Sequence, residues 1–199
     1  MATEWKVLAK ARNDFADILD GLSEEQLASQ SLCEEWSVTD VAGHLVSLIE
    51  MSRIALVTGI VRNRKDVDGY LSVKAKEFAS TGAAALAQTL RANAAKQLKP
   101  LSEGAMVSDT AVHTLDITRP LGLAKTLDPQ VVTVALDAGV TELAKKRKGE
   151  PIPRLVATDM EWSWGDGPEV SGTGEALLLA LNGRNVADEL EGAGALLLA

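Results

Sequence analysis

The chain has 199 residues, of which 46% are hydrophobic and 24% are charged, values typical of one folded domain with at most a small appendage. Its formal net charge is −8, so most of its exterior would repel nucleic acid and anionic membranes, and we expect neither partner. A single cysteine, Cys33, excludes an internal disulfide, and no apolar run approaches the ~18 residues of a membrane span or resembles a signal peptide. We therefore expect a cytoplasmic protein.

The first part of the chain is predicted to be helical, because apolar residues recur there at helical spacing. Residues 4–20 form the first such stretch, and a capping box that begins at Ser23 predicts a short helix directly after it. Ser37 and Asp40 predict the start of the next helix, which the apolar pattern continues without a break to about Val61.

Further helices are predicted in the middle of the chain, over residues 71–80, 82–98, 104–118 and 129–146. The last of these begins with Asp128 as N-cap and proline at the first helical position. Because short loops join these helices, they favour an antiparallel bundle.

After residue 150 the apolar pattern changes its period. Residues 156–164 alternate between apolar and polar, residues 165–167 (GDG) supply a turn, and residues 169–171 can return as a partner strand. A capped helix follows. We therefore expect a helical bundle over residues 1–150 and a small α+β segment, a hairpin plus a helix, packed on it over residues 151–199.

The candidate chemistry rests on the two histidines, His44 and His113, each of which lies on a predicted helix. Asp109 lies four residues before His113 and Asp116 three residues after it, so all three share one helix face. Two imidazoles and a carboxylate on facing helices are enough to hold a divalent ion with open positions. The same spacing also suits two core histidines that bind no metal, and it leaves that alternative open.

Three motifs extend this pattern: residues 31–45 (SLCEEWSVTDVAGHL), 112–117 (VHTLDI) and 167–184, which opens with GPEVSG and ends with Gly-Arg. In this order they resemble the mycothiol-dependent maleylpyruvate isomerase family, which belongs to the DinB-like superfamily of metal-binding four-helix bundles. The resemblance implies a mainly α fold, a DinB-like antiparallel four-helix bundle with a small C-terminal α+β unit. It also implies a divalent metal, zinc first and nickel or another ion as alternatives, with the small thiol mycothiol as cosubstrate.

The resemblance also implies roles for individual residues. Carried over by position, the metal ligands are His44, Asp109 and His113. Asp116 falls at the position of a catalytic aspartate, and Arg184 matches a catalytic arginine that would also bind a carboxylate of substrate or thiol conjugate. The family has Glu where this chain has Asp109, a side chain one methylene shorter, so its oxygens would reach ~1.5 Å less far.

These residues also have simpler interpretations. Asp116 and Arg119 are three apart and suit an exposed ion pair, and Arg184 follows a helix end whose carbonyls it could bind. Cys33 is followed by two glutamates, whose charges disfavour a thiolate, so we interpret it as structural.

The sequence therefore favours a metal- and mycothiol-dependent transferase or isomerase that acts on an electrophilic small molecule, as a monomer or homodimer. The alternative is a non-catalytic helical bundle that binds a small apolar ligand or a protein partner. Asp109 discriminates between them: it must converge with both histidines for the enzyme and face solvent for the binding module.

Overall fold

A computed structural model describes residues 4–98, 101–148 and 152–194 of the protein. Along these residues the helices are α1 (Glu4–Asp20), α2 (Glu24–Ala28), α3 (Val38–Glu50), α4 (Arg53–Arg62), α5 (Val67–Ala79), α6 (Ala83–Ala92), α7 (Glu103–Thr118), α8 (Pro129–Lys146), α9 (Gly174–Leu181) and a 3₁₀ turn at Ala187–Glu189. The strands are β1 (Arg154–Ala157), β2 (Ser163–Trp164) and β3 (Glu169–Gly172). The predicted mainly α fold with a small α+β unit is confirmed.

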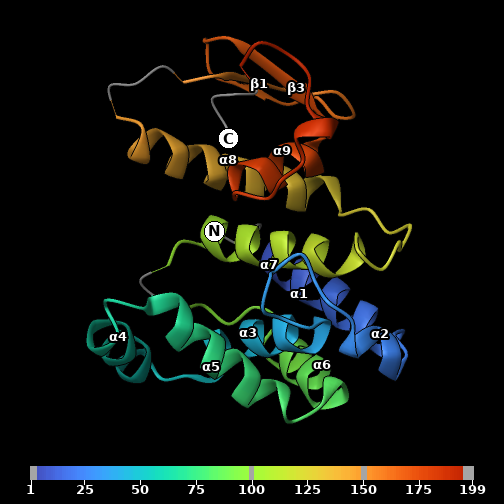
Figure 1. The fold of residues 1–199 in the computed structure, drawn as a ribbon, viewed down its shortest axis with the longest axis vertical. Coiled ribbons are helices and arrows are strands. Elements are labelled where there is room, and N and C mark those ends of the chain that lie inside the picture. Colours follow the sequence, from blue (N-terminus) through green and yellow to red (C-terminus); the bar gives the residue numbers. More distant parts are fainter. Residues whose placement is uncertain (1–3, 99–100, 149–151, 195–199) are drawn as a thin grey trace.

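The elements are stacked in layers (Figure 1). The sheet lies over α8 and α9, α7 lies beneath them, and α3, α5 and α6 lie on the far side of α7. Helices α1, α6, α3 and α7 contact one another in a ring, which is the predicted four-helix bundle. Among the described residues no single helix is long and apolar enough to cross a membrane; the bent pair Val38–Glu50 and Ile54–Arg62 reaches that length and composition only when both helices are counted.

Local capping signals set where the helices begin. At the start of α3, the Ser37 hydroxyl accepts the Asp40 N–H at 3.1 Å and the Asp40 carboxylate accepts the Ser37 N–H at 3.0 Å, so the predicted capping box is present. Asp66 is a cap that the sequence analysis missed. Its carboxylate accepts the Gly69 N–H at 2.9 Å, and α5 therefore begins at Val67 rather than at residue 71.

The prediction of one long helix to Val61 is wrong. Helix α3 ends at Glu50, Met51 adopts an extended conformation, and Ser52 caps a new helix by accepting the Ala55 N–H at 3.1 Å. The serine hydroxyl thus stabilises a second helix start inside an unbroken apolar pattern. The break turns α4 away from the core.

The helix predicted to end at residue 98 also stops early, because another helix supplies partners for its last carbonyls. Helix α6 ends at Ala92. The buried guanidinium of Arg12, on α1, donates to the carbonyls of Asn93, Ala94 and Lys96 at 3.0, 3.2 and 2.9 Å. These carbonyls bond to Arg12 instead of continuing a helix.

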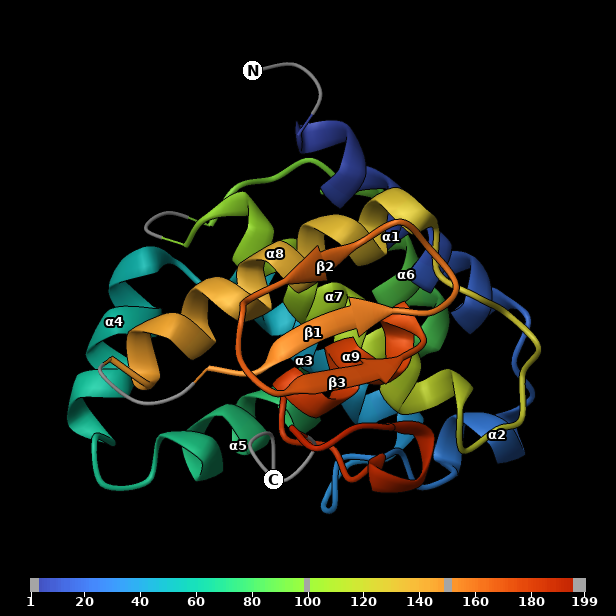
Figure 2. The same cartoon turned by 90° about the horizontal axis from the view of Figure 1, so that it is seen from above.

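The C-terminal unit differs from the predicted hairpin in its strand pairing. The strand order is β2-β1-β3, with β1 antiparallel to β2 and parallel to β3. Residues 169–171 do pair with the first part of the predicted strand, at Val156, but in the parallel sense, so the predicted hairpin through residues 165–167 is wrong. A tight turn interrupts the predicted strand, where the Ala157 N–H donates to the Trp162 carbonyl at 3.0 Å. The sheet covers α9 and the neighbouring part of α8 (Figure 2). The predicted domain boundary at residue 150 lies outside the described residues.

Helix α7 occupies the centre of the molecule. Twelve of its sixteen residues are buried, and its apolar side chains join both core clusters, one shared with α8, α9 and the sheet and one shared with α3 and α6. A polar side chain on such a helix loses its water, so it must find a partner from a neighbouring element. His113 and Asp116, the two buried site residues of α7, therefore need partners from neighbouring groups.

Helix α5 lies against α3 because residue 43 is glycine. A Cβ added to Gly43 would lie 2.2 Å from the Ala75 carbonyl oxygen and 2.7 Å from the Ala79 nitrogen, closer than any real contact. At Gly43 it is therefore the backbone of α5 that approaches α3.

Candidate metal centre

Helices α3 and α7 bring the three predicted ligands together. The Asp109 Oδ1 lies 3.5 Å from the His44 Nε2 and 3.6 Å from the His113 Nε2. The three ligand atoms all lie within 4.8 Å of one another, and the two imidazole ring centres are 4.8 Å apart. Both histidines are buried, whereas the Asp109 side chain is one-third exposed, so the group is reachable from outside on the Asp109 side.

These spacings fit a bound cation better than hydrogen bonds. Distances of 3.5 and 3.6 Å are too long for good N–H···O hydrogen bonds. In a tetrahedral site with metal–ligand bonds of about 2.1 Å, neighbouring ligand atoms are about 3.4 Å apart. Two imidazoles and one carboxylate are also a donor set that zinc accepts, with a fourth position left open.

In the part of the chain that the structure describes, the buried His44 ring lacks the partner at Nδ1 that metal-binding histidines usually have and that His113 finds in Asp116. Its Nδ1 has no hydrogen-bond partner among the residues that the structure describes, although it is shielded from water. Buried polar atoms are usually paired, and a histidine that served only the core would be expected to pair both nitrogens. His44 therefore does not behave as a satisfied core histidine.

The shorter side chain at position 109 still reaches both histidines. The sequence analysis expected its oxygens to extend ~1.5 Å less far than those of a glutamate. Asp109 nevertheless places one oxygen at nearly equal distances from the two Nε2 atoms. Helices α3 and α7 approach closely enough to make up the difference, and no glutamate is needed to complete the group.

The opposite edge of the His113 ring contacts Asp116. The His113 Nδ1 lies 2.8 Å from the Asp116 Oδ2, and the Asp116 side chain is completely buried. Arg184 binds both oxygens of the same carboxylate, with Nε at 3.0 Å and Nη2 at 2.6 Å. An exposed Asp116–Arg119 pair is therefore ruled out, since Arg119 pairs instead with Glu189.

Arg184 also satisfies a helix-end carbonyl, as its simpler interpretation predicted. Its Nη1 donates to the Asn182 carbonyl at the end of α9, at 2.8 Å. The two interpretations of Arg184 are thus compatible, because separate N–H groups serve the helix end and the carboxylate.

These contacts shift the pKa values of the site in opposite directions. Burial alone would lower the pKa of His113, but its hydrogen bond to Asp116 and the nearby carboxylates raise it to about 10. Burial alone would raise the pKa of Asp116, but His113 and Arg184 lower it to about 2. The pKa of Asp109 is lowered too, because the two histidines outweigh its burial. Without a metal, His113 is therefore protonated at neutral pH, and a cation that binds at Nε2 would release a proton.

Cys33 belongs to this site, which the sequence analysis did not predict. Its thiol donates to the Asp116 Oδ2 at 3.2 Å and lies 3.6 Å from the Arg184 Nη2. The main chain holds it there, because the N–H of Leu32 donates to the Asp116 carbonyl oxygen at 2.9 Å. The interpretation of Cys33 as structural looked only at its sequence neighbours, Glu34 and Glu35, which are exposed.

Trp36 forms one wall of the site. Its ring centre lies 4.9 Å from that of His44 and 5.9 Å from that of His113. Its indole N–H donates to the Ser72 hydroxyl of α5 at 3.0 Å. The indole therefore covers both imidazoles on this side and links α5 to the site.

Residues 8–104 match the sequence profile of a family described as mycothiol maleylpyruvate isomerase N-terminal domain. This part of the chain belongs to that family. The resemblance predicted from the motifs is thus confirmed, and the matched residues include His44, Trp36 and Cys33. The site residues on α7 and after α9 lie beyond the matched range.

Solved structures extend the likeness to nearly the whole chain. The crystal structure of a mycothiol-dependent maleylpyruvate isomerase is similar over 96% of this chain and 92% of that chain, with a TM-score of 0.56 and 11% sequence identity. A histidine-to-alanine mutant of a mycothiol-dependent maleylpyruvate isomerase matches over the same shares, with a TM-score of 0.54 and 12% identity. At these identities the likeness shows a shared fold. No curated protein matches the chain significantly.

Proposed function

We propose that the protein is a divalent-metal-dependent enzyme that uses mycothiol to transfer a thiol to, or to isomerise, an electrophilic small molecule. The observation that carries the proposal is the convergence of the His44 Nε2, the Asp109 Oδ1 and the His113 Nε2. The family of residues 8–104, named for an isomerase, supports an enzyme. The same convergence disfavours the non-catalytic alternative, for which Asp109 was expected to face solvent.

The proposed cation would contribute one property. When bound, it would lower the pKa of a thiol ligand, so that the thiolate forms at neutral pH. A thiolate adds to an electrophilic carbon or an activated double bond. In a transfer the new C–S bond remains; in an isomerisation the adduct rotates about the former double bond and then eliminates the same thiol.

The protein's own residues would orient these reactants. Asp116 holds the His113 Nδ1–H and so directs Nε2 toward Asp109, the arrangement typical of histidines that bind metals. With a pKa of about 2, Asp116 is an anion at neutral pH, so it acts by orienting His113 and Arg184 rather than by donating a proton.

Arg184 keeps hydrogen-bonding capacity for a substrate. Its guanidinium carries five N–H groups, and Asp116 and the Asn182 carbonyl engage it through Nε, Nη1 and Nη2. Nη2 also donates to the Cys33 Sγ at 3.6 Å, so one N–H group on Nη1 remains. The side chain is 24% exposed, so this N–H group can reach a carboxylate of the substrate or the thiol conjugate.

The donor set and the single cysteine refine the proposal. Zinc is favoured, because two imidazoles and a carboxylate are a common three-ligand set for catalytic zinc, and nickel is the alternative. A free thiol cosubstrate and an unpaired Cys33 both suit a reducing compartment, so we place the enzyme in the cytoplasm.

Elemental analysis tests the metal directly. We expect about one metal ion per chain in wild-type protein purified with zinc supplied, and only traces in His113→Ala, which removes a ligand. The control variant Asp188→Asn changes an exposed acidic residue outside the ligand group and should retain the metal. Trace metal in all three proteins would contradict the proposal.

Activity is tested separately on the zinc-loaded protein. Conjugation of mycothiol to a model electrophile should be faster with the wild-type protein than in buffer, and the acceleration should disappear in His113→Ala. If the protein binds one metal ion per chain but does not accelerate the conjugation, it is a metal-binding protein and the proposed enzymatic activity is refuted.

A further inference from the structure

The segment from Met51 to Gly82, here called the α4–α5 lobe, has a charge opposite to that of the whole chain. It contains six Lys and Arg residues and three Asp and Glu residues, whereas the chain has a net charge of −8. A local excess of cations on an acidic protein attracts anions to that place rather than to the rest of the surface. The charge of the α4–α5 lobe therefore suits an anionic ligand.

A pocket lies between the two helices of this lobe. Its volume is about 420 Å³, within the range of small-molecule sites. Apolar groups of Met51, Ala55 and Phe78 line it. Its charged lining consists of Arg62, Lys74 and Glu77, and because Glu77 pairs with Lys74, Arg62 supplies the excess positive charge. No residue of the His44, Asp109 and His113 group lines this pocket, so it is separate from the candidate metal centre.

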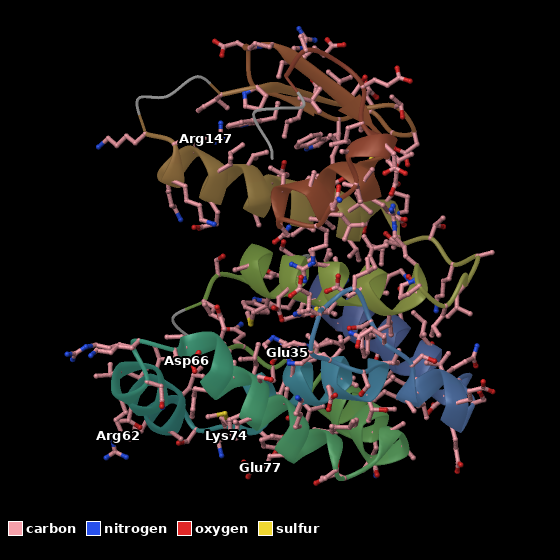
Figure 3. All side chains as sticks on the ribbon, viewed as in Figure 1. Glu35, Arg62, Asp66, Lys74, Glu77 and Arg147 are labelled. Carbon is pink, nitrogen blue, oxygen red and sulfur yellow. The ribbon has the colours of Figure 1, made fainter. Side chains whose placement is uncertain are left out.

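The two cations come from different helices and project at the same edge of the molecule (Figure 3). Lys74 is paired with Glu77 at 2.5 Å on its own helix. The side chain of Arg62 has no hydrogen bond or ion pair with any residue that the structure describes. Its planar guanidinium is therefore available to bind a carboxylate through two parallel hydrogen bonds.

Exposed apolar side chains are concentrated on the same two helices. Among the large hydrophobic residues that the structure shows as exposed, four of six lie on α4 and α5. They are Ile54 (77% exposed), Val57 (52%), Val61 (59%) and Val73 (64%). None of these four residues lines the pocket, so they belong to the outer faces of the two helices and not to the proposed binding site.

We propose that the α4–α5 pocket binds a small amphipathic carboxylic acid. Its hydrocarbon or aromatic body would lie against Met51, Ala55 and Phe78, and its carboxylate would bind Arg62 with Lys74 beside it. An apolar body alone would not use the unpaired guanidinium, and a fully polar anion would not use the apolar lining. The proposal does not depend on a metal at His44, so the two sites can be tested independently.

The test is calorimetric titration of the full-length protein with decanoate, below the concentration at which decanoate forms micelles. We expect saturable binding of one decanoate per chain. The double variant Arg62→Gln/Lys74→Gln should bind at least about tenfold more weakly, the effect of losing a charge-assisted hydrogen bond. The matched variant Arg64→Gln/Lys65→Gln removes the same charge from the same lobe but outside the pocket lining, and should bind within about twofold of wild type.

A neutral ligand and a second readout make the test decisive. Decanol, which has the same chain without the charge, should bind at least about tenfold more weakly than decanoate. Circular dichroism spectra that superimpose would show that each variant is folded. Equal weakening in both double variants would overturn the proposal, since only the general charge of the lobe would then matter.

Other occupants of the surface give distinguishable results. Sedimentation with vesicles that contain anionic phospholipid, without binding of free decanoate, would overturn the proposal in favour of a lipid surface. A concentration-dependent dimer that blocks decanoate binding would overturn it in favour of a second copy of the chain.

Discussion

The two edges of the His113 ring differ in how completely the protein satisfies them. At Nδ1, Asp116 and Arg184 form contacts of 2.6 to 3.0 Å that leave the carboxylate fully buried. At Nε2, the Asp109 oxygen is 3.6 Å away and partly exposed. The protein completes by itself the side that orients the ring, and it leaves long contacts on the side where a ligand would bind.

The largest expected effect is on stability at the Asp116 edge. Asp116→Asn leaves Arg184 and the protonated His113 without their counter-charge, so we expect a loss of about 3 kcal/mol in the free energy of unfolding of metal-free protein at pH 7. This is near the lower end for a broken buried pair, because Arg184 is 24% exposed. Urea denaturation measures it, with Asp188→Asn as the control. A loss below about 1 kcal/mol would contradict the comparison.

Asp109→Asn should show the opposite pattern. Because the Asp109 contacts are too long to be strong hydrogen bonds, we expect little change in the unfolding free energy of metal-free protein. Zinc affinity should fall more than about 100-fold, beyond the 10–100-fold expected when an orienting partner such as Asp116 is lost. Competition with a chromogenic chelator measures both variants. If Asp109→Asn retained the wild-type affinity, Asp109 would not be a ligand.

The pH dependence of stability should test the contacts of Asp116 directly. The pKa of Asp116 is about 2 in the folded protein, against an ordinary value of 3.8. The stabilisation is therefore present above about pH 4 and is lost as the pH falls to about 2, since the unfolded chain takes up a proton first. The amount is about 2 kcal/mol. Denaturation at pH 5 and pH 2.5 should show that Asp116→Asn lacks this loss; a parallel pH profile would refute the assignment.

The smallest effect is expected at Cys33. Cys33→Ala removes one weak donor to the Asp116 carboxylate, which keeps its contacts with His113 and Arg184. We expect the unfolding free energy to fall by about 1 kcal/mol or less. Cys33→Ser, which keeps a donor, is the matched control and should lose less. A loss as large as that of Asp116→Asn would mean that the thiol, rather than Arg184, holds the carboxylate.

Much of the site could be predicted from the sequence because its signals are local. The spacing of Asp109, His113 and Asp116 places them on one helix face wherever the helix lies, and the Ser37 cap sets the position of His44 on α3. That these two faces meet at one point depends on packing, and the three motifs supplied that expectation through resemblance.

The features that the sequence did not predict depend on competition between local and tertiary contacts. Ser52 caps a new helix where the apolar period continues unbroken, so the period alone could not show the break. Residues up to Trp162 and Trp164 do alternate, but a tight turn between Ala157 and Trp162 divides them into two strands. Strand β3 then pairs parallel with β1 rather than forming an antiparallel hairpin. Cys33 reaches Asp116 across 83 residues, a distance over which the charges of its sequence neighbours carry no information.

The close packing of α5 on α3 at Gly43 affects how the two imidazoles are covered. Even a methyl group there would have to push α5 outward, since no rotamer change can move the Ala75 carbonyl oxygen out of its way. Ser72 would travel with α5 and draw the indole ring of Trp36 off the histidines. An alanine at position 43, beside His44 but not part of the ligand group, would thereby admit water to both rings.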